Sequence, residues 1–272
     1  WVHWQHGVSK FHFRYCASAG SPPPFKKVYF QTTHLRLKQY EEGTIKAGKY
    51  DVLIPITKRD QDSFKKIGNR KPSFFANAGI DFTHIPEPEQ QLEYPSLYYL
   101  GALDWEPNKE GMRWFIKEVW PRVSRAFPEM PFYLAGRNMP PEFSKMKKKN
   151  LIVVGEVEDA YEFIRDKGIM VAPILSGSGM RVKIVEAMAH GKGIVATTQA
   201  AEGLATKHGD HLLIGDSPGD FFNHIAILVE NRNMYNTLGK HARTLAHKFY
   251  NNQDIIENLA GFYQRQIRSK NK

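Results

Sequence analysis

The sequence predicts an α/β fold whose second half, from about Tyr94 onward, contains a doubly wound parallel sheet. Short, continuous apolar segments recur along this half, and most are followed by a segment with apolar residues at helical spacing. The apolar segments do not alternate with polar residues, which is typical of strands buried on both faces. Strands that alternate with helices form right-handed units with parallel strands.

The elements of this half follow in order. Strands are expected at 97–100, 132–135, 151–154, 169–173, 193–197 and 212–214. A helix with apolar residues at helical spacing is expected after Pro107, with a kink at Pro121. Further helices are expected at about 159–167, 180–190, 218–231, 233–248 and 253–268.

The first half is less regular. A helix is expected at about 27–42, a buried strand at 50–56, a helix at 58–67 capped by Thr57, and a short strand at 72–75. Residues 83–96 are polar and proline-rich without periodicity, which predicts a linker. The predicted domains are therefore residues 1–91, residues 92–252, and a C-terminal helix at 253–272 that is expected to cross back to the first domain.

Composition limits the classes of partner. The 272 residues are 42% hydrophobic and carry a formal net charge of +10, which favours anionic partners. Nothing resembles a zinc finger, an aromatic RNA-binding strand or a basic zipper, so no nucleic-acid partner is expected. No apolar run approaches the roughly 18 residues of a membrane span. The single cysteine, Cys16, fits a reducing compartment, and a cytoplasmic location is expected.

In doubly wound sheets ligands bind outside the carboxyl ends of the strands. The loops that begin at Gly101, Gly136, Gly155 and Leu175 are therefore the expected site.

The segment from Pro173 to Gly191 carries most of the chemistry. Ser176-Gly177-Ser178-Gly179 follows a buried strand and precedes a helix. Glycines let a ligand approach the backbone, and free N–H groups at a helix N-terminus attract phosphate. Arg181 and Lys183 add positive charge, and Glu186 lies on the same helix face as Lys183. The alternative interpretation is a glycine-rich turn followed by a surface ion pair. The order of these residues after a buried strand, glycines first, then the two cations and then the carboxylate, favours a site for a phosphorylated ligand that also carries hydroxyl groups.

The sequence resembles the retaining glycosyltransferases of GT-B architecture, in the branch called glycosyl transferase group 1. The segments that carry the resemblance are 98–108, 114–122, 155–159, 176–191 and 200–204, with weaker matches at 38–41 and 56–60. The resemblance implies two Rossmann-like domains, of which the first is only partial here, because about 90 residues precede the linker.

The resemblance also implies roles for individual residues. The C-terminal domain would bind a nucleoside diphosphate sugar, with Gly101 under the diphosphate and Val157 at the base. Arg137, Gly177, Ser178 and Gly179 are further candidate donor-binding residues. Arg181 and Lys183 would neutralise the leaving diphosphate as the catalytic groups, and Glu186 would hold the ribose. Ser178 stands where many members carry a glutamate that touches the sugar.

The implied activity is a retaining hexosyltransferase that needs no metal or other cofactor. Its acceptor would be a glycan or lipid-linked glycan in polysaccharide biosynthesis, and the basic surface would favour peripheral association with the inner face of a membrane. Two alternatives stay open. The fragment could bind donor without transferring sugar, or it could be a nucleotide-sugar epimerase on the same fold.

Overall fold

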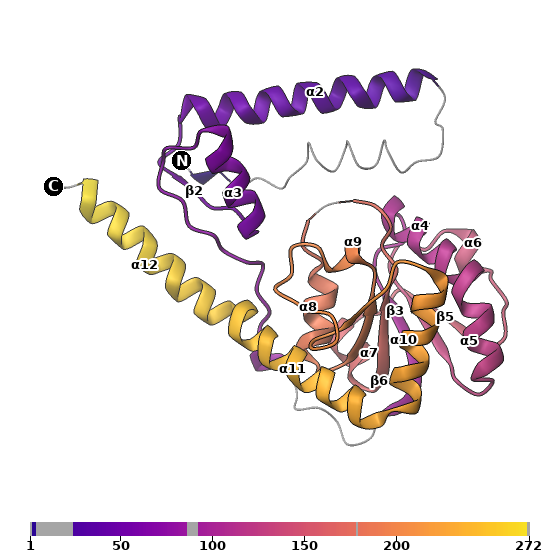
Figure 1. Cartoon of the computed structure of the whole chain (residues 1–272). Helices are drawn as coiled ribbons and strands as arrows, with labels where there is room; N and C mark the ends of the chain where they lie inside the picture. Colours follow the sequence, from indigo (N-terminus) through magenta and orange to yellow (C-terminus); the bar gives the residue numbers. More distant parts are fainter. Residues whose placement is uncertain (1, 4–23, 86–91, 178, 271–272) are drawn as a thin grey trace. The chain divides into compact units, whose positions relative to one another are not determined.

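The computed structural model describes residues 2–3, 24–85, 92–177 and 179–270 (Figure 1). The chain divides into two compact units. The N-terminal unit holds residues 1–79, 176–180 and 250–272, and the sheet unit holds residues 80–175 and 181–249. The linker residues 86–91, where the predicted domain boundary falls, lie outside the described residues.

The sheet unit is built on six parallel strands in the order β5-β4-β3-β6-β7-β8. The predicted doubly wound parallel sheet is therefore confirmed. The strands are β3 Glu93–Leu100, β4 Phe132–Ala135, β5 Leu151–Gly155, β6 Lys167–Ala172, β7 Gly193–Ala196 and β8 Leu213–Ile214.

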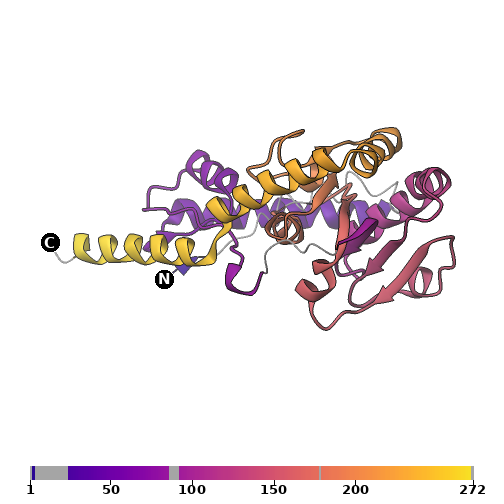
Figure 2. The ribbon, with the colours of Figure 1, turned by 90° about the horizontal axis from the view of Figure 1, so that it is seen from below.

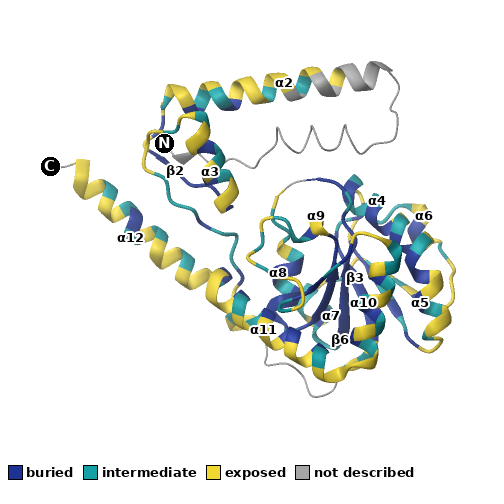
Figure 3. Ribbon diagram, in the orientation of Figure 1, coloured by how far each residue is buried: buried dark blue, intermediate teal, exposed yellow. Residues whose placement is uncertain are grey.

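Helices lie on both sides of this sheet (Figure 1). Figure 3 shows the strands as dark blue, buried segments, whereas the outer faces of the helices are exposed. The helical elements of the unit are η1 Phe82–His84, α4 Glu106–Trp114, η2 Phe115–Val119, α5 Trp120–Ala126, α6 Pro141–Ser144, α7 Ala160–Arg165, α8 Val182–Ala189, α9 Thr198–Ala201, α10 Pro218–Glu230 and α11 Arg232–Tyr250.

One continuous core fills the side of the sheet that carries α4, η2, α5 and α10. Phe115 packs against Phe132 and Phe221, with ring centroids 5.2 and 6.1 Å apart, and Trp120 packs against Phe132 at 5.3 Å. Alternate strand residues point to the other side, where Tyr98 meets Phe163 of α7. Burial on both faces explains why these strands contain apolar residues without alternation.

The predicted linker was too long at its C-terminal end, because β3 begins at Glu93 rather than at Leu97. Glu93 pairs with Lys167 of β6, and its N–H donates to the Asp166 carbonyl at 2.8 Å. Pro95 has no N–H to donate, and the pairing of β3 with β6 shifts register between Glu93 and Leu97. The proline and its polar neighbours hid this half of a central strand from pattern analysis.

The helix expected to kink at Pro121 instead contains a π-helical turn, η2, before that residue. The Trp120 N–H donates to the carbonyl of Phe115, five residues back. Pro121 then stands in the first turn of α5, where the missing N–H has no helical partner to lose. The wider turn absorbs the proline without ending the helix.

The N-terminal unit contains less regular structure: β1 Val2–His3, α2 Pro24–Ala47, β2 Val52–Leu53, α3 Lys58–Ile67 and α12 Asn252–Lys270. Thr57 caps α3 as predicted, since its hydroxyl oxygen accepts from the Asp60 N–H at 3.0 Å. The strand predicted at 50–56 shrinks to β2, which pairs in parallel with β1, and the one at 72–75 is a single bridge between Leu53 and Ser73.

Helix α12 contributes to the core of this unit. Figure 2 shows α12, in yellow, as one straight helix. Phe262 is buried with Val52, Ile54 and Ala76, and its ring stacks on Phe74 with centroids 5.4 Å apart. Lys270 of α12 also pairs with Asp51.

Candidate functional site

The chain reverses its direction of travel across the sheet at β3. From β3 it proceeds through β4 to β5 on one side, and it then returns to β6 on the other side of β3. At such a reversal the connecting loops diverge, which leaves a crevice at the carboxyl ends of the strands.

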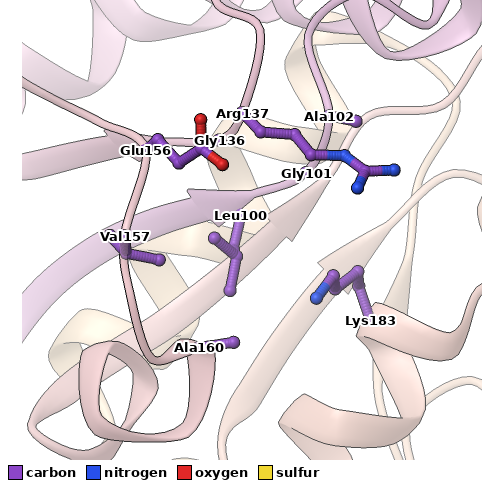
Figure 4. A pocket seen from close by; sticks show the side chains of 9 residues that line it. All are labelled: Leu100, Gly101, Ala102, Gly136, Arg137, Glu156, Val157, Ala160 and Lys183. Atoms are coloured by element: carbon purple, nitrogen blue, oxygen red, sulfur yellow. The ribbon is translucent and has the colours of Figure 1, made fainter.

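A cavity of about 360 Å³ lies at this place (Figure 4). Glu156, Val157 and Ala160 lie at one end of it, while the side chains of Arg137 and Lys183 extend into the half away from them. The lining combines the ends of β3, β4 and β5 with the first turn of α8: Leu100, Gly101, Ala102, Gly136, Arg137, Glu156, Val157, Ala160 and Lys183.

Two glycines are required because the loops approach each other closely. A Cβ atom on Gly136 would lie 1.8 Å from the Gly101 carbonyl oxygen, and one on Gly101 would lie 2.7 Å from the Tyr99 hydroxyl. A side chain at Gly136 would displace the loop backbone at Gly101, whereas one at Gly101 would displace the Tyr99 ring. The backbone therefore forms part of the cavity wall directly.

Lys183 and Glu186 form an ion pair, with Nζ 3.1 Å from Oε2. The Lys183 side chain is 43% exposed, whereas Glu186 is 12% exposed. Burial raises the pKa of the nearby Tyr98 hydroxyl well above its usual value, and the Glu186 carboxylate adds to that shift. The pair presents a cation to the cavity with a carboxylate behind it, as predicted from the spacing.

Arg137 and Glu156 are both exposed at the cavity. Within the described part of the chain, neither side chain forms a hydrogen bond or ion pair. The Arg137 guanidinium can bind phosphate oxygens in a bidentate manner. Charged groups without protein partners at the rim of a cavity are available to a ligand.

Arg181 is the N-cap residue of α8, and it does not line the cavity. Burial raises the pKa of the Tyr99 hydroxyl, and the positive charge of Arg181 counteracts part of that rise. The same Tyr99 hydroxyl borders Gly101. Arg181 thus lies near the end of β3, outside the cavity lining.

The helix predicted from about Met180 begins at Val182. Gly177 and Gly179 have φ angles of 93° and 96°, in the left-handed region that a right-handed helix cannot use. These glycines do not line the cavity, and Ser178 lies outside the described residues. The later start follows from Arg181, whose φ of −92° and ψ of 88° are not helical.

The structure therefore brings together four predicted site residues: Gly101, Arg137, Val157 and Lys183. Glu186 joins them through Lys183. Sequence reasoning missed Glu156 and Ala160, although the loop at Gly155 was expected at the site. No cluster of three metal-binding side chains is present among the residues that the structure describes.

The sheet and its reversal point define a doubly wound α/β protein, and the cations at the cavity suit a phosphorylated ligand. Residues 94–231 match the family Glycosyl transferases group 1. Because this match covers half of the chain, the chain belongs to that family.

The comparisons with individual proteins agree. An uncharacterized 44.6 kDa protein in the cps region of Klebsiella pneumoniae is 24% identical over 250 residues, which cover 86% of this chain and 61% of that protein. The sucrose-phosphate synthase of Thermosynechococcus elongatus has a TM-score of 0.69 at 15% identity, covering 99% of this chain and 68% of that one. Anabaena Alr3699/HepE, in complex with UDP and glucose, has a TM-score of 0.70 at 17% identity, covering 97% and 71%. The fold is thus of the GT-B glycosyltransferase type.

The chain is shorter than its relatives. It spans 61% of the Klebsiella protein. It also spans 46% of S. aureus TarM, to which it is similar with a TM-score of 0.68 at 15% identity over 84% of this chain. None of the described helices is both long and apolar enough to cross a membrane.

Proposed function

We propose that this protein transfers a sugar from a nucleoside diphosphate sugar to a glycan or lipid-linked acceptor, with retention of anomeric configuration. The observation that carries the proposal is the cavity at the carboxyl ends of β3, β4 and β5, which gathers Gly101, Arg137, Val157 and Lys183. It offers exposed backbone and two cations within one crevice, which suits a diphosphate flanked by a base and a sugar.

The cavity suggests an orientation for the donor. Arg137 and Lys183 extend into one half, so the diphosphate would lie there and accept their hydrogen bonds (Figure 4). Val157 and Ala160 lie at the other end, which would hold the base. Glu186, beside Lys183, would accept hydrogen bonds from the ribose hydroxyls.

Catalysis would be electrostatic. When the bond between sugar and diphosphate breaks, negative charge builds on the leaving phosphate. Lys183, which lines the cavity, and Arg181, the N-cap residue of α8 outside the lining, are the groups proposed to stabilise it. The N-terminus of α8, the positive end of the helix dipole, would add to their effect. Fixed positive charge of this kind can replace a metal ion, so the proposed reaction is metal-independent.

The comparisons support the donor class. The solved structures include Alr3699/HepE with UDP-glucose and the pneumococcal O-GlcNAc transferase GtfA with UDP and GlcNAc. The cps-region relative supports a role in polysaccharide biosynthesis, where the acceptor would be a glycan. The protein would meet a lipid-linked acceptor at the inner face of a membrane. Its net charge of +10 would attract it to the anionic lipids there.

The first experiment is thermal unfolding with UDP, GDP, ADP and CMP, each with and without magnesium. A nucleotide at about 100 times its dissociation constant adds about 2.7 kcal/mol to the unfolding free energy. For a chain of this size Tm should rise by roughly 5–10 °C. We expect one nucleoside diphosphate to give this rise, and magnesium to leave it unchanged.

The matched control is the double variant Lys183→Ala with Glu186→Ala, which should unfold at a similar temperature without nucleotide but lose the rise. A rise that survives in the double variant would place binding elsewhere. Incubation with the matching sugar donor then separates the alternatives. Turnover that requires an acceptor supports a transferase, consumption of donor alone supports an epimerase, and binding without turnover indicates a donor-binding fragment.

A further inference from the structure

The peptide group between Ala102 and Leu103 is held from both sides. The Ala102 carbonyl accepts a hydrogen bond from the side-chain amide of Asn108, with Nδ2 2.7 Å from the oxygen. The Leu103 N–H donates to the carbonyl of Arg137 at 3.0 Å. A peptide whose donor and acceptor are both bonded cannot rotate without breaking one of them.

This peptide group links two loops that line the cavity. Ala102 and Arg137 line the cavity from two different loops, after β3 and after β4. One residue earlier, the Gly101 N–H donates to the Ala135 carbonyl at 3.2 Å and continues the strand pairing. Hence the bond from Leu103 fixes where the backbone of Arg137 lies relative to Gly101.

A second contact joins the same two loops. Asn138 donates from Nδ2 to Oδ2 of Asp104 at 2.9 Å. Asn138 has a φ of 53°, in the left-handed region that asparagine tolerates better than most residues. This side-chain pair flanks Arg137 on the side away from β4. We call Asp104, Asn108 and Asn138 the loop clamp.

Asn108 is not explained by helix capping. It stands in the first turn of α4, whose N-cap residue Trp105 provides no side-chain capping bond. The amide group of Asn108 points back to a loop carbonyl six residues earlier instead of toward the free N–H groups of the helix. Its bond therefore orders the loop rather than the helix end.

We infer that the loop clamp positions Arg137 and the Gly101–Ala102 backbone for the diphosphate of the donor. This inference rests on the proposed function of the cavity. A loop already held in its binding conformation loses less conformational entropy when the ligand binds. Loss of the clamp should therefore weaken binding of a nucleoside diphosphate while the sheet, whose core lies elsewhere, stays folded.

The test is calorimetric binding of UDP to the wild-type chain and to Asn108→Leu, which keeps the side-chain size and removes the donor. The dissociation constant should rise about tenfold, the effect of one lost hydrogen bond of ordinary strength. The Tm without nucleotide should change by only a few degrees. The matched control is Asn258→Leu on α12, where the amide donates to the Asp254 carbonyl at the same 2.7 Å. Its UDP affinity should equal the wild-type value.

A reciprocal exchange tests the second contact without depending on Asn108. Asn138→Asp opposes two carboxylates and should weaken UDP binding several-fold. Adding Asp104→Asn to Asn138→Asp restores a donor and an acceptor, with their positions exchanged, and should recover most of the affinity. Recovery by the exchange is a result that a general loss of stability would not give.

The outcomes separate this inference from the proposed function. If neither UDP nor GDP, ADP or CMP binds to the wild-type chain, the proposed function fails and the clamp role fails with it. If the wild-type chain binds UDP or another of these nucleotides, the same comparison is made with that nucleotide. Unchanged affinity in Asn108→Leu, or an exchange that restores nothing, then overturns the clamp alone. Should Asn108→Leu not fold, the exchange decides.

Discussion

The two edges of the sheet place similar charged residues in opposite situations. At the carboxyl edge, Arg137 and Glu156 are exposed at a cavity, and Lys183 is half-exposed there. Toward the amino edge, Lys167 is buried beneath its partners, with Nζ 2.7 Å from Asp166, 3.5 Å from Glu93 and 4.4 Å from the centre of the Tyr133 ring.

The difference teaches how to separate binding charges from structural ones. A buried lysine whose ammonium group is already bonded to neighbouring side chains stabilises the fold, and it has no free donor for a ligand. A lysine or arginine left open at strand ends costs little stability and can bind an anion. The four predictions below test whether the two edges are functionally separate, from the largest expected effect to the smallest.

The largest effect concerns acid stability at the end of α8 that is remote from the cavity. His190 is 4% exposed, and burial, followed by the charges of Lys192 and Arg243, lowers its pKa to about 4. The unfolded value is about 6.5. The folded chain thus binds fewer protons between these values, so the neutral histidine's stabilisation is complete above pH 6.5 and is lost as the pH falls to 4.

We expect His190→Gln to remove this acid sensitivity. At pH 4 the wild-type chain should have lost about 3 kcal/mol of unfolding free energy through His190, a loss the variant does not share. Urea unfolding of both proteins at pH 7, 5.5 and 4 measures it. Parallel pH profiles for the two proteins would show that His190 does not titrate as described.

The second effect is at the carboxyl edge. Lys183→Met removes a charged donor from the cavity, and the dissociation constant of the bound nucleoside diphosphate should rise about 30-fold, or about 2 kcal/mol. The Tm should fall by no more than a few degrees, because Lys183 is half-exposed and Glu186, although 12% exposed, is the only group among the described residues that loses its ion-pair partner. Calorimetric titration and thermal unfolding measure the two quantities. A large fall in Tm would show that Lys183 is structural after all.

The third effect uses the same substitution at the other edge. Lys167→Met should lower the unfolding free energy by about 1–2 kcal/mol, because it removes a buried cation from two carboxylates and an aromatic ring. The carboxylates are themselves about half-exposed, which limits the loss. Nucleotide affinity should stay at the wild-type value in the same titration. Equal losses of nucleotide affinity in Lys167→Met and Lys183→Met would contradict the view that only the carboxyl edge binds the ligand.

The smallest effect is a gain. Glu156 places a carboxylate at the cavity, where it repels a diphosphate. Glu156→Gln should therefore strengthen binding about two- to threefold at low salt and less at high salt. Glu158→Gln, an exposed neighbour outside the cavity lining, is the control and should change less. Weaker binding in Glu156→Gln would indicate that this carboxylate contacts the ligand directly.

Pattern analysis found most of the sheet because strands buried on both faces consist of continuous apolar residues, which can be recognised in the sequence. Topology predicted that the loops at Gly101, Gly136 and Gly155 meet at the site, since it places strand ends together. Arg137 and Val157 were candidates through the resemblance to the glycosyltransferases, and Lys183 through the segment that follows Pro173. The position of Glu156 at the cavity could not be predicted, because a polar residue after a strand is typical of any loop.

The features that escaped prediction depend on contacts rather than on periodicity. The first half of β3 was hidden by Pro95, which pattern rules exclude from a central strand. The bond from Asn108 to the Ala102 carbonyl joins a side chain to backbone six residues away, and no spacing rule describes it. The strands of the N-terminal unit were overestimated: of the strand predicted at 50–56, the described structure pairs Val52 and Leu53 with β1, and the apolar residues around them pack in small clusters.

The packing of Phe262 against Val52, Ile54 and Ala76 has a consequence for synthesis of the chain. A ribosome delivers the N-terminal segment first, but one wall of its core is encoded near the far end. The sheet unit draws its strands and helices from the stretch between, and it can form while α12 is still being made. The N-terminal unit therefore needs α12 to complete its core, and α12 is made only after the segments of the sheet unit.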